Sequence, residues 1–153
     1  MVPAVTLTRS STNASLLYTG SMDVKLPHEI VGRVLKYKGN GRKLGYPTAN
    51  IDSDTDLRDG VYFGFADLDT YANQATLIFI GTPTTMGDTQ RRVEAHVLDI
   101  NDVDYYGSEL RLRLEQFHRS NQTFDSVEKL MVAMKADELA GREWVKGLQR
   151  VQG

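Results

Sequence analysis

The stretch Leu110-Arg111-Leu112-Arg113-Leu114-Glu115-Gln116-Phe117 alternates apolar and polar residues from position 110 to position 115. A period of two residues is typical of a β-strand with one buried face and one exposed face. Shorter apolar runs precede this strand, and turn residues separate them, which is the spacing expected of a barrel or a sandwich. These predicted strands cover residues 30–37, 61–68, 75–80 and 93–100, with one further candidate at residues 46–51.

The hydrophobic period changes after Phe124, where the sequence predicts a helix. We expect Asp125 as its N-cap and Glu128 as the capping-box partner. The helix should run to about residue 140, and the apolar pattern also allows it to continue past Gly141 through Trp144. Its apolar face is expected to contain Val127, Leu130, Met131 and Met134. Many short strands followed by one amphipathic helix indicate an antiparallel barrel with the helix packed against it.

The bulk composition restricts the classes of protein that remain. The chain of 153 residues fits one ordinary domain, and its 18 basic and 20 acidic residues give no overall attraction to nucleic acid or to membranes. The absence of cysteine excludes disulfides, thiolate metal sites and cysteine nucleophiles. No signal-peptide pattern and no run of about 18 apolar residues occurs, so we expect a cytoplasmic protein without a membrane anchor.

A local cluster of positive charge lies between residues 33 and 43. Glycines here would let successive backbone N–H groups face an anion, and the flanking cations would supply the countercharge that a polyphosphate requires. Asn40-Gly41 is also a strong signal for a two-residue β-hairpin, so these residues alone leave a phosphate loop and an ordinary exposed turn both open. The cluster comprises Arg33, Lys36, Lys38, Arg42 and Lys43, interleaved with Gly39 and Gly41.

The next eight residues, Leu44-Gly45-Tyr46-Pro47-Thr48-Ala49-Asn50-Ile51, contain two polar side chains at alternate positions. In an extended chain Thr48 and Asn50 point to the same side, about 7 Å apart. A hydroxyl and an amide oxygen are suitable ligands for Mg²⁺, which proteins usually share with substrate phosphates. The alternative is a strand that begins after Pro47 and in which Asn50 only caps a turn.

The pattern Gly39-x-Gly41-Arg42-x-Leu44-Gly45-x-Pro47-Thr48-Ala49-Asn50 resembles the signature of the ATP-dependent riboflavin kinases. Further segments resemble motifs of that family in the right order: residues 59–62 (Asp-Gly-Val-Tyr), 80–84, 93–99 (Val-Glu-Ala-His-Val-Leu-Asp), 106–107 and 124–130. The resemblance covers residues 30–140 or so, and several ordered motifs are far more specific than any single one.

This resemblance implies a mainly β fold, a six-stranded antiparallel Greek-key barrel with a C-terminal α-helix. It also implies an enzyme that transfers the γ-phosphate of ATP to the 5′-hydroxyl of riboflavin, giving FMN and ADP, with Mg²⁺ as cofactor. By position, Glu94 would be the catalytic base and Arg119 would lie near the flavin and the nucleotide. Gly39, Gly41, Arg42 and Thr48 would bind the ATP phosphates, and Thr48 with Asn50 would hold the metal.

Two observations qualify these implied roles. Without the resemblance, Glu94 would be interpreted as a solvated glutamate on a strand face that it shares with His96 and Leu98. The sequence also departs from the family pattern, with Tyr37 where a glycine is usual and Asn121 where a glutamate is frequent. Trp144 is expected to pack in the helix interface rather than to stack on a flavin.

The chain divides into an arm at residues 1–28 and a kinase domain at residues 29–153. The arm weakly resembles the end of the adenylyltransferase module of bacterial bifunctional FAD synthetases, through Val2-Pro3-Ala4-Val5 and Ser10-Ser11-Thr12. One rival hypothesis is a catalytically inactive flavin-binding or regulatory module on the same barrel. Another is an unrelated barrel that binds anions or RNA, but the acidic balance and the lack of an aromatic and basic strand face argue against it. Protein partners stay open.

Overall fold

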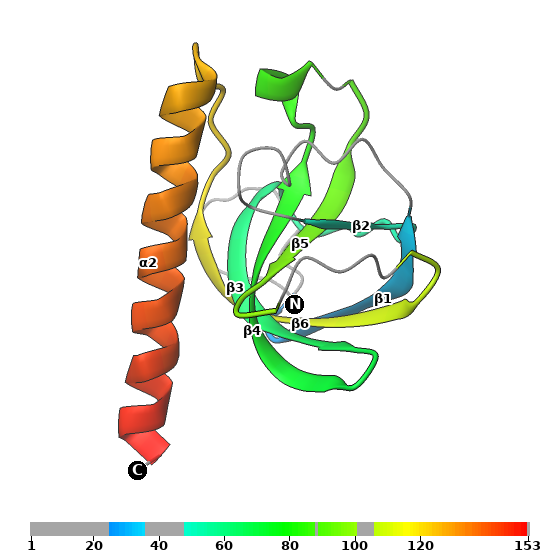
Figure 1. Ribbon diagram of the computed structural model, residues 1–153, viewed down its shortest axis with the longest axis vertical. Helices are drawn as coiled ribbons and strands as arrows, with labels where there is room; N and C mark the ends of the chain where they lie inside the picture. The colour runs from blue at the N-terminus through cyan, green and yellow to red at the C-terminus, as the bar shows by residue number, and fades with distance from the viewer. Residues whose placement is uncertain (1–24, 36–47, 88, 101–105, 153) are drawn as a thin grey trace, which may run out of the picture.

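The computed structural model describes residues 25–35, 48–87, 89–100 and 106–152. Six antiparallel strands close into a barrel in the order β1-β2-β5-β4-β3-β6, and a long helix, α2, lies against its outside (Figure 1). The elements are β1 (His28–Leu35), β2 (Ala49–Ile51), β3 (Gly60–Leu68), β4 (Tyr71–Gly81), the 3₁₀ turn η1 (Thr84–Met86), β5 (Arg92–Val97), β6 (Glu109–Arg119) and α2 (Val127–Gln152).

The strand order confirms the predicted Greek-key barrel. Strands β3, β4 and β5 are consecutive neighbours, and β6 returns to lie beside β3, which is the Greek-key arrangement. Strand β1 pairs with β6 on one side and with the short strand β2 on the other. Because β2 in turn pairs with β5, every strand of the barrel has two neighbours.

The start of β4 and the end of β5 differ from the prediction because of local backbone turns. Strand β4 begins at Tyr71 rather than at residue 75, since a turn at Asp69, with φ of 56°, brings Tyr71 opposite Leu68. Strand β5 ends at Val97 rather than at residue 100, because Asp99 adopts a φ of 64° that no strand allows. The predicted ends at residues 37 and 46 lie outside the described residues.

Apolar side chains from all six strands fill the barrel interior. Leu110, Leu112 and Leu114 are fully buried there, whereas Arg111 and Arg113 between them face outward, as the alternation predicted. Leu57, from the connection between β2 and β3, packs into the same cluster. The remaining buried members are Ile30, Val34, Ile51, Tyr62, Ala66, Leu68, Ile78, Ile80, Val93 and Ala95.

A second, smaller apolar cluster joins α2 to the outer face of β3 and β4. Trp144 lies with its ring centroid 5.8 Å from that of Phe63 and 5.6 Å from that of Phe65, so it packs in the helix interface as predicted. Gly141 lets the helix approach closely, because a Cβ atom there would lie 2.8 Å from Cδ2 of Leu77. The helix therefore continues through Gly141 to Gln152, the longer of its two predicted extents.

The predicted N-cap of this helix is wrong by one residue. The backbone N–H of Lys129 donates to Oγ of Ser126 at 3.1 Å, so Ser126 is the N-cap and α2 begins at Val127. Asp125 instead forms an ion pair with Nζ of Lys129 at 3.0 Å. Glu128 therefore stands at the second helical position, one short of the capping-box position.

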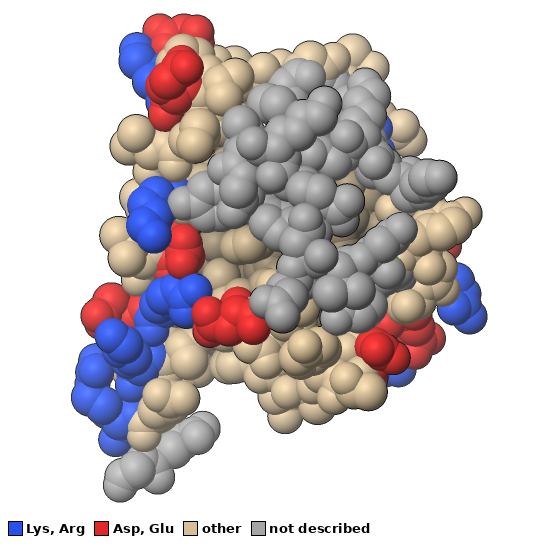
Figure 2. Space-filling model, viewed as in Figure 1, with Lys and Arg blue, Asp and Glu red and all other residues tan. Residues whose placement is uncertain are grey.

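The face of α2 that meets the barrel is also rotated from the predicted one. Val127 and Met131 are each 38% exposed, so neither is a core residue. The buried positions Asp137 and Gly141 lie on the inward face instead. On the rest of α2, basic and acidic side chains mix, as Figure 2 shows along that side of the molecule. No described helix is both long enough and apolar enough to span a membrane.

Candidate functional site

Three of the predicted site residues meet on the outer surface of β2 and β5. The hydroxyl of Thr48 donates a hydrogen bond of 3.0 Å to Oε1 of Glu94. Asn50 lies directly opposite Glu94 in the pairing of β2 with β5. Ala95 points into the barrel, so the neighbouring Glu94 points outward. The alternation of side chains along both strands thus puts Thr48, Asn50 and Glu94 on the same surface.

The amide oxygen of Asn50 is the most unusual atom of this site. The residue is 7% exposed, and its Oδ1 is buried and has no hydrogen-bond partner among the residues that the structure describes. Leaving a buried acceptor unsatisfied costs about 1–3 kcal/mol, so a native structure rarely contains one without a reason. A bound cation that Oδ1 coordinates would remove this cost.

The donor set fits a hard divalent cation such as Mg²⁺. Oxygen atoms of a hydroxyl (Thr48), an amide (Asn50) and a carboxylate (Glu94) lie together, and Mg²⁺ binds one or two protein oxygens plus substrate phosphates and waters. Among the described residues there is no group of three or more His, Cys, Asp or Glu that could hold a metal by itself. A cation here would therefore need oxygens from a phosphate ligand to complete its coordination.

Glu94 has the geometry of a general base. It stands on a strand, which limits its backbone motion, and the hydrogen bond from Thr48 orients its carboxylate. An oriented carboxylate can accept a proton from a hydroxyl that binds within about 3 Å of it. The glycine loop of the predicted nucleotide site, with Gly39, Gly41 and Arg42, lies outside the described residues, as does Tyr37.

Arg119 lies at a distance from these three residues and has a partner of its own. Its Nε and Nη2 donate to the two carboxylate oxygens of Asp137 at 2.8 and 2.7 Å. Nε2 of His118 lies 3.3 Å from the same carboxylate. In the strand pairing, Glu94 is opposite Phe79, which is opposite Val61, which is opposite Arg119. Arg119 is therefore three strand spacings, roughly 14 Å, from Glu94 across the barrel surface.

Asp137 is a residue that the sequence analysis missed. It is 2% exposed, although it lies in a helix whose other charged residues are largely at the surface. The signal that could have found it is its phase, because it falls between Met134 and Gly141 on the side that packs against the barrel. A carboxylate buried there requires a cationic partner, and Arg119 is that partner.

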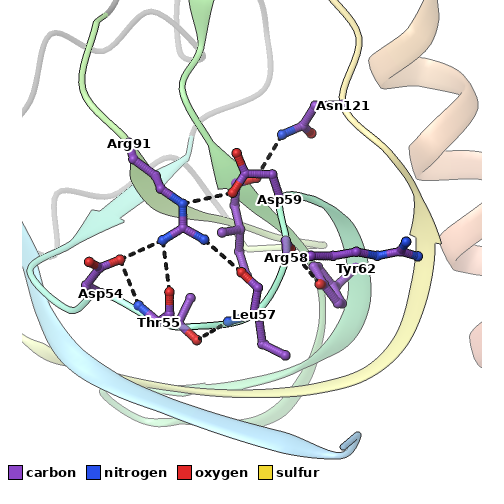
Figure 3. A network of polar contacts seen from close by, with 9 residues as sticks. Asp54, Thr55, Leu57, Arg58, Asp59, Tyr62, Arg91 and Asn121 are labelled. Atoms are coloured by element: carbon purple, nitrogen blue, oxygen red, sulfur yellow. Dashed lines mark hydrogen bonds and ion pairs between the residues drawn. The ribbon is translucent and has the colours of Figure 1, made fainter. Parts of the chain in front are cut away.

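A second missed group surrounds Arg91, just before β5. Its guanidinium binds the connection between β2 and β3, including the carboxylates of Asp54 and Asp59 (Figure 3). No sequence signal identifies this cluster, because Arg91 is more than 30 positions from Asp54 and Asp59 and meets them only when β2 pairs with β5.

Comparison with known proteins settles the family of this barrel. The family model described as Flavokinase, riboflavin kinase, matches residues 24–145. The chain belongs to the riboflavin kinase family. It is 29% identical to human riboflavin kinase over 119 residues, which is 73% of this chain and 77% of the human protein.

A bacterial relative has the same module within a longer protein. The chain is 32% identical over 126 residues to the bifunctional riboflavin kinase/FMN adenylyltransferase of Escherichia coli, covering 77% of this chain but only 38% of that protein. The crystal structure of riboflavin kinase from Trypanosoma brucei superimposes with a TM-score of 0.60 at 23% identity, over 79% of this chain and 81% of that one, a likeness of fold. Riboflavin kinases use ATP to convert riboflavin into FMN, with ADP as the second product.

Proposed function

We propose that this riboflavin kinase carries out its reaction at the surface formed by Thr48, Asn50 and Glu94. The observation that carries the proposal is the convergence of these side chains: Thr48 bonds to Glu94 at 3.0 Å, and Asn50 faces Glu94 across paired strands. Phosphoryl transfer asks a protein mainly to position two substrates and to neutralise charge, and these three residues offer a base and two neutral oxygen ligands.

In the proposed reaction Glu94 accepts the proton of the riboflavin 5′-hydroxyl. The hydroxyl oxygen forms a bond to the terminal phosphorus of ATP, and the bond from that phosphorus to the bridging oxygen breaks, which releases ADP. Thr48 supports this step because its hydrogen bond fixes the direction of the Glu94 carboxylate. Orienting a base in this way avoids the entropic cost of ordering it in the transition state.

Thr48 and Asn50 would hold the Mg²⁺ ion of the bound nucleotide. The support for this assignment is the buried Oδ1 of Asn50, for which the described residues offer no hydrogen-bond partner. When bound, Mg²⁺ supplies charge neutralisation for the phosphate oxygens. The contribution of the protein is to keep two neutral oxygens at fixed positions on β2 and beside its start.

Other parts of the proposal rest on the family resemblance alone. Gly39, Gly41 and Arg42 would line the ATP phosphates, and Arg119 would lie near the flavin and the nucleotide. We also propose the division into an arm at residues 1–28 and a kinase domain at residues 29–153. We also propose a cytoplasmic location. The partners are proposed to be small molecules rather than nucleic acids, which the net charge of −2 supports.

The direct test is to incubate the purified chain with riboflavin and MgATP and to quantify FMN and ADP by chromatography. We expect FMN and ADP to form in equal amounts, and we expect EDTA to stop the reaction. MgCTP as an alternative donor would report the nucleotide preference. Riboflavin binding without FMN formation would contradict the proposal and favour a catalytically inactive flavin-binding module.

A further inference from the structure

The guanidinium of Arg91 holds the connection between β2 and β3 through four polar contacts (Figure 3). Nη1 donates to Oδ1 of Asp54 at 2.7 Å and to the carbonyl of Thr55 at 2.9 Å. Nη2 donates to the carbonyl of Leu57 at 2.7 Å, and Nε donates to Oδ1 of Asp59 at 2.8 Å. One side chain at the start of β5 therefore fixes most of a connection whose ends are β2 and β3.

The same connection is tied to β1 from its other side. Oδ1 of Asp52 accepts the backbone N–H of Arg33 at 2.7 Å, and the hydroxyl of Ser53 donates to the carbonyl of Val31. This contact requires a glycine at position 32, because a Cβ atom on Gly32 would lie 2.7 Å from both of these side-chain oxygens. The chain that leaves β2 is thus held between its two neighbouring strands.

These contacts matter because β2 is so short that its own strand pairing gives it little support. It has three residues, with two paired positions toward β1 and three toward β5. Its central residue is Asn50, and Thr48 directly precedes it. Arg91, which binds the chain after β2, directly precedes β5, the strand that carries Glu94.

We propose that Arg91 is a positioning residue for the metal and phosphate site. Arg91 binds residues 54–59 and so attaches them to the chain just before β5. This contact keeps β2 in register with β5, so that the oxygens of Thr48 and Asn50 stay beside Glu94. The inference rests on the proposed function of these three residues. Arg91 itself contacts neither substrate nor metal in this scheme and acts only through the backbone that it holds.

A role in stability alone is the competing explanation, and the contacts allow it. Leu57, whose carbonyl Arg91 binds, is buried in the barrel interior. The two ion pairs are exposed, however, with the side chains of Asp54 and Asp59 87% and 51% accessible, and exposed pairs contribute little to the free energy of folding. The decisive readout is therefore the affinity for the metal, measured separately from stability.

The experiment compares Arg91→Gln and Arg91→Lys with the parent and with Arg111→Gln. Arg111 is a matched control because it forms an exposed ion pair of 3.0 Å with Glu29, near the end of β1 that is opposite to its pairing with β2. Three quantities are measured: the half-saturating Mg²⁺ concentration, the KM for riboflavin, and the affinity for Mn²⁺ with ADP by electron paramagnetic resonance, which needs no turnover. Urea unfolding of each variant reports stability.

We expect Arg91→Gln to weaken Mn²⁺·ADP binding and to raise the Mg²⁺ requirement about tenfold, the lower end of the loss typical for outer partners of a metal site. The KM for riboflavin should stay within about twofold, and Arg111→Gln should match the parent. Arg91→Lys should behave like Arg91→Gln, because an ammonium cannot reproduce four contacts of a planar guanidinium.

Asp54→Asn provides a second variant if the Arg91 variants do not fold. It removes the negative charge from one exposed contact of Arg91, so we expect a shift of about two- to fivefold in the same direction. Parental Mn²⁺ affinity in a folded Arg91 variant, or in Asp54→Asn if those variants do not fold, would overturn the inference, as would lower stability without a change in metal affinity. If the parent makes no FMN at all, the proposed function fails, and this inference fails with it.

Discussion

At the scale of single residues, the proposed site depends on which side chains alternate outward on β2 and β5. Asn50 and Glu94 are opposite in the pairing, and Thr48 reaches the carboxylate from just outside β2. Each has a different expected role, so substitutions should separate them. A base affects the rate of the chemical step, whereas a metal ligand affects the dependence on Mg²⁺.

Glu94→Gln should lower kcat by about 10²–10⁴-fold, the usual contribution of a general base, with little change in the KM for riboflavin or MgATP. Glutamine preserves the size and the strand but cannot take the proton. Glu115→Gln on β6 is a suitable control, because Glu115 is also an outward glutamate with a bonded partner, Arg113. A kcat within about threefold of the parent, under about 0.7 kcal/mol of barrier, would exclude Glu94 as the base.

Asn50→Ala should raise the Mg²⁺ or MgATP concentration needed for half-maximal rate more than it raises the KM for riboflavin. The reason is that Oδ1 of Asn50, the proposed ligand atom, has no hydrogen-bond partner in the described part of the chain. Since no hydrogen bond of that atom is lost, we expect a stability change within about 1 kcal/mol by urea unfolding. Unchanged metal dependence would remove Asn50 from the site.

At the scale of elements, ion pairs at Asp137 and Arg142 join α2 to the barrel within the described part of the chain. Asp137 binds Arg119 of β6, and Arg142 binds Asp99, which follows β5, with two hydrogen bonds of 2.9 and 3.1 Å. The first pair has a carboxylate that is 2% exposed, whereas the side chain of Asp99 is 63% exposed. The two ion pairs should therefore contribute different amounts to the free energy of unfolding.

Asp137→Ala should lower the free energy of unfolding by about 3 kcal/mol, because it leaves the guanidinium of Arg119 partly buried without its partner. Asp99→Ala, the matched exposed case, should cost less than about 1 kcal/mol. Urea unfolding of both variants beside the parent measures the difference. Equal costs would mean that burial of Asp137 does not determine its contribution.

The contact between Asp99 and Arg142 should also make the stability of the docked helix depend on pH. The hydrogen bond from Arg142 lowers the pKa of Asp99 below its usual 3.8, although partial burial opposes this. A lowered folded-state pKa contributes stability that is present above the unfolded-state pKa and is lost as the pH falls through the folded-state pKa. We expect the melting temperatures of the parent and Asp99→Asn to differ at pH 7 and to converge in acid below the lowered pKa. A difference that persists there would contradict this assignment.

At the scale of the whole molecule, the match to the riboflavin kinase family covers the barrel and most of α2. The chain spans 38% of the bifunctional riboflavin kinase/FMN adenylyltransferase of E. coli. A nucleotidyltransferase domain needs on the order of 100 residues, and the 28 residues before the proposed kinase domain are far fewer. We therefore expect the purified 153-residue chain to make no FAD from FMN and MgATP, while it does make FMN from riboflavin. Detection of FAD by chromatography would contradict this.

The sequence by itself determined the local properties of this protein. The alternation from Leu110 to Leu114 predicted which side of β6 is buried, and the change of period after Phe124 predicted the helix. The same period of two put Thr48 and Asn50 on one surface before any partner was known. These predictions succeed because the spacing of residues along an extended or helical backbone is fixed by local geometry alone. The ordered motifs added the family, which the match to residues 24–145 confirmed.

Only the tertiary structure decided which distant residues meet. Closure of the barrel puts Asn50 opposite Glu94, docking of α2 brings Asp137 to Arg119, and pairing of β2 with β5 places Arg91 on the chain after Asn50. A periodic pattern states which face of an element is apolar, but many partners can cover that face. The choice among them depends on how all the elements bury their apolar surface together and satisfy their polar groups, which is a property of the whole chain.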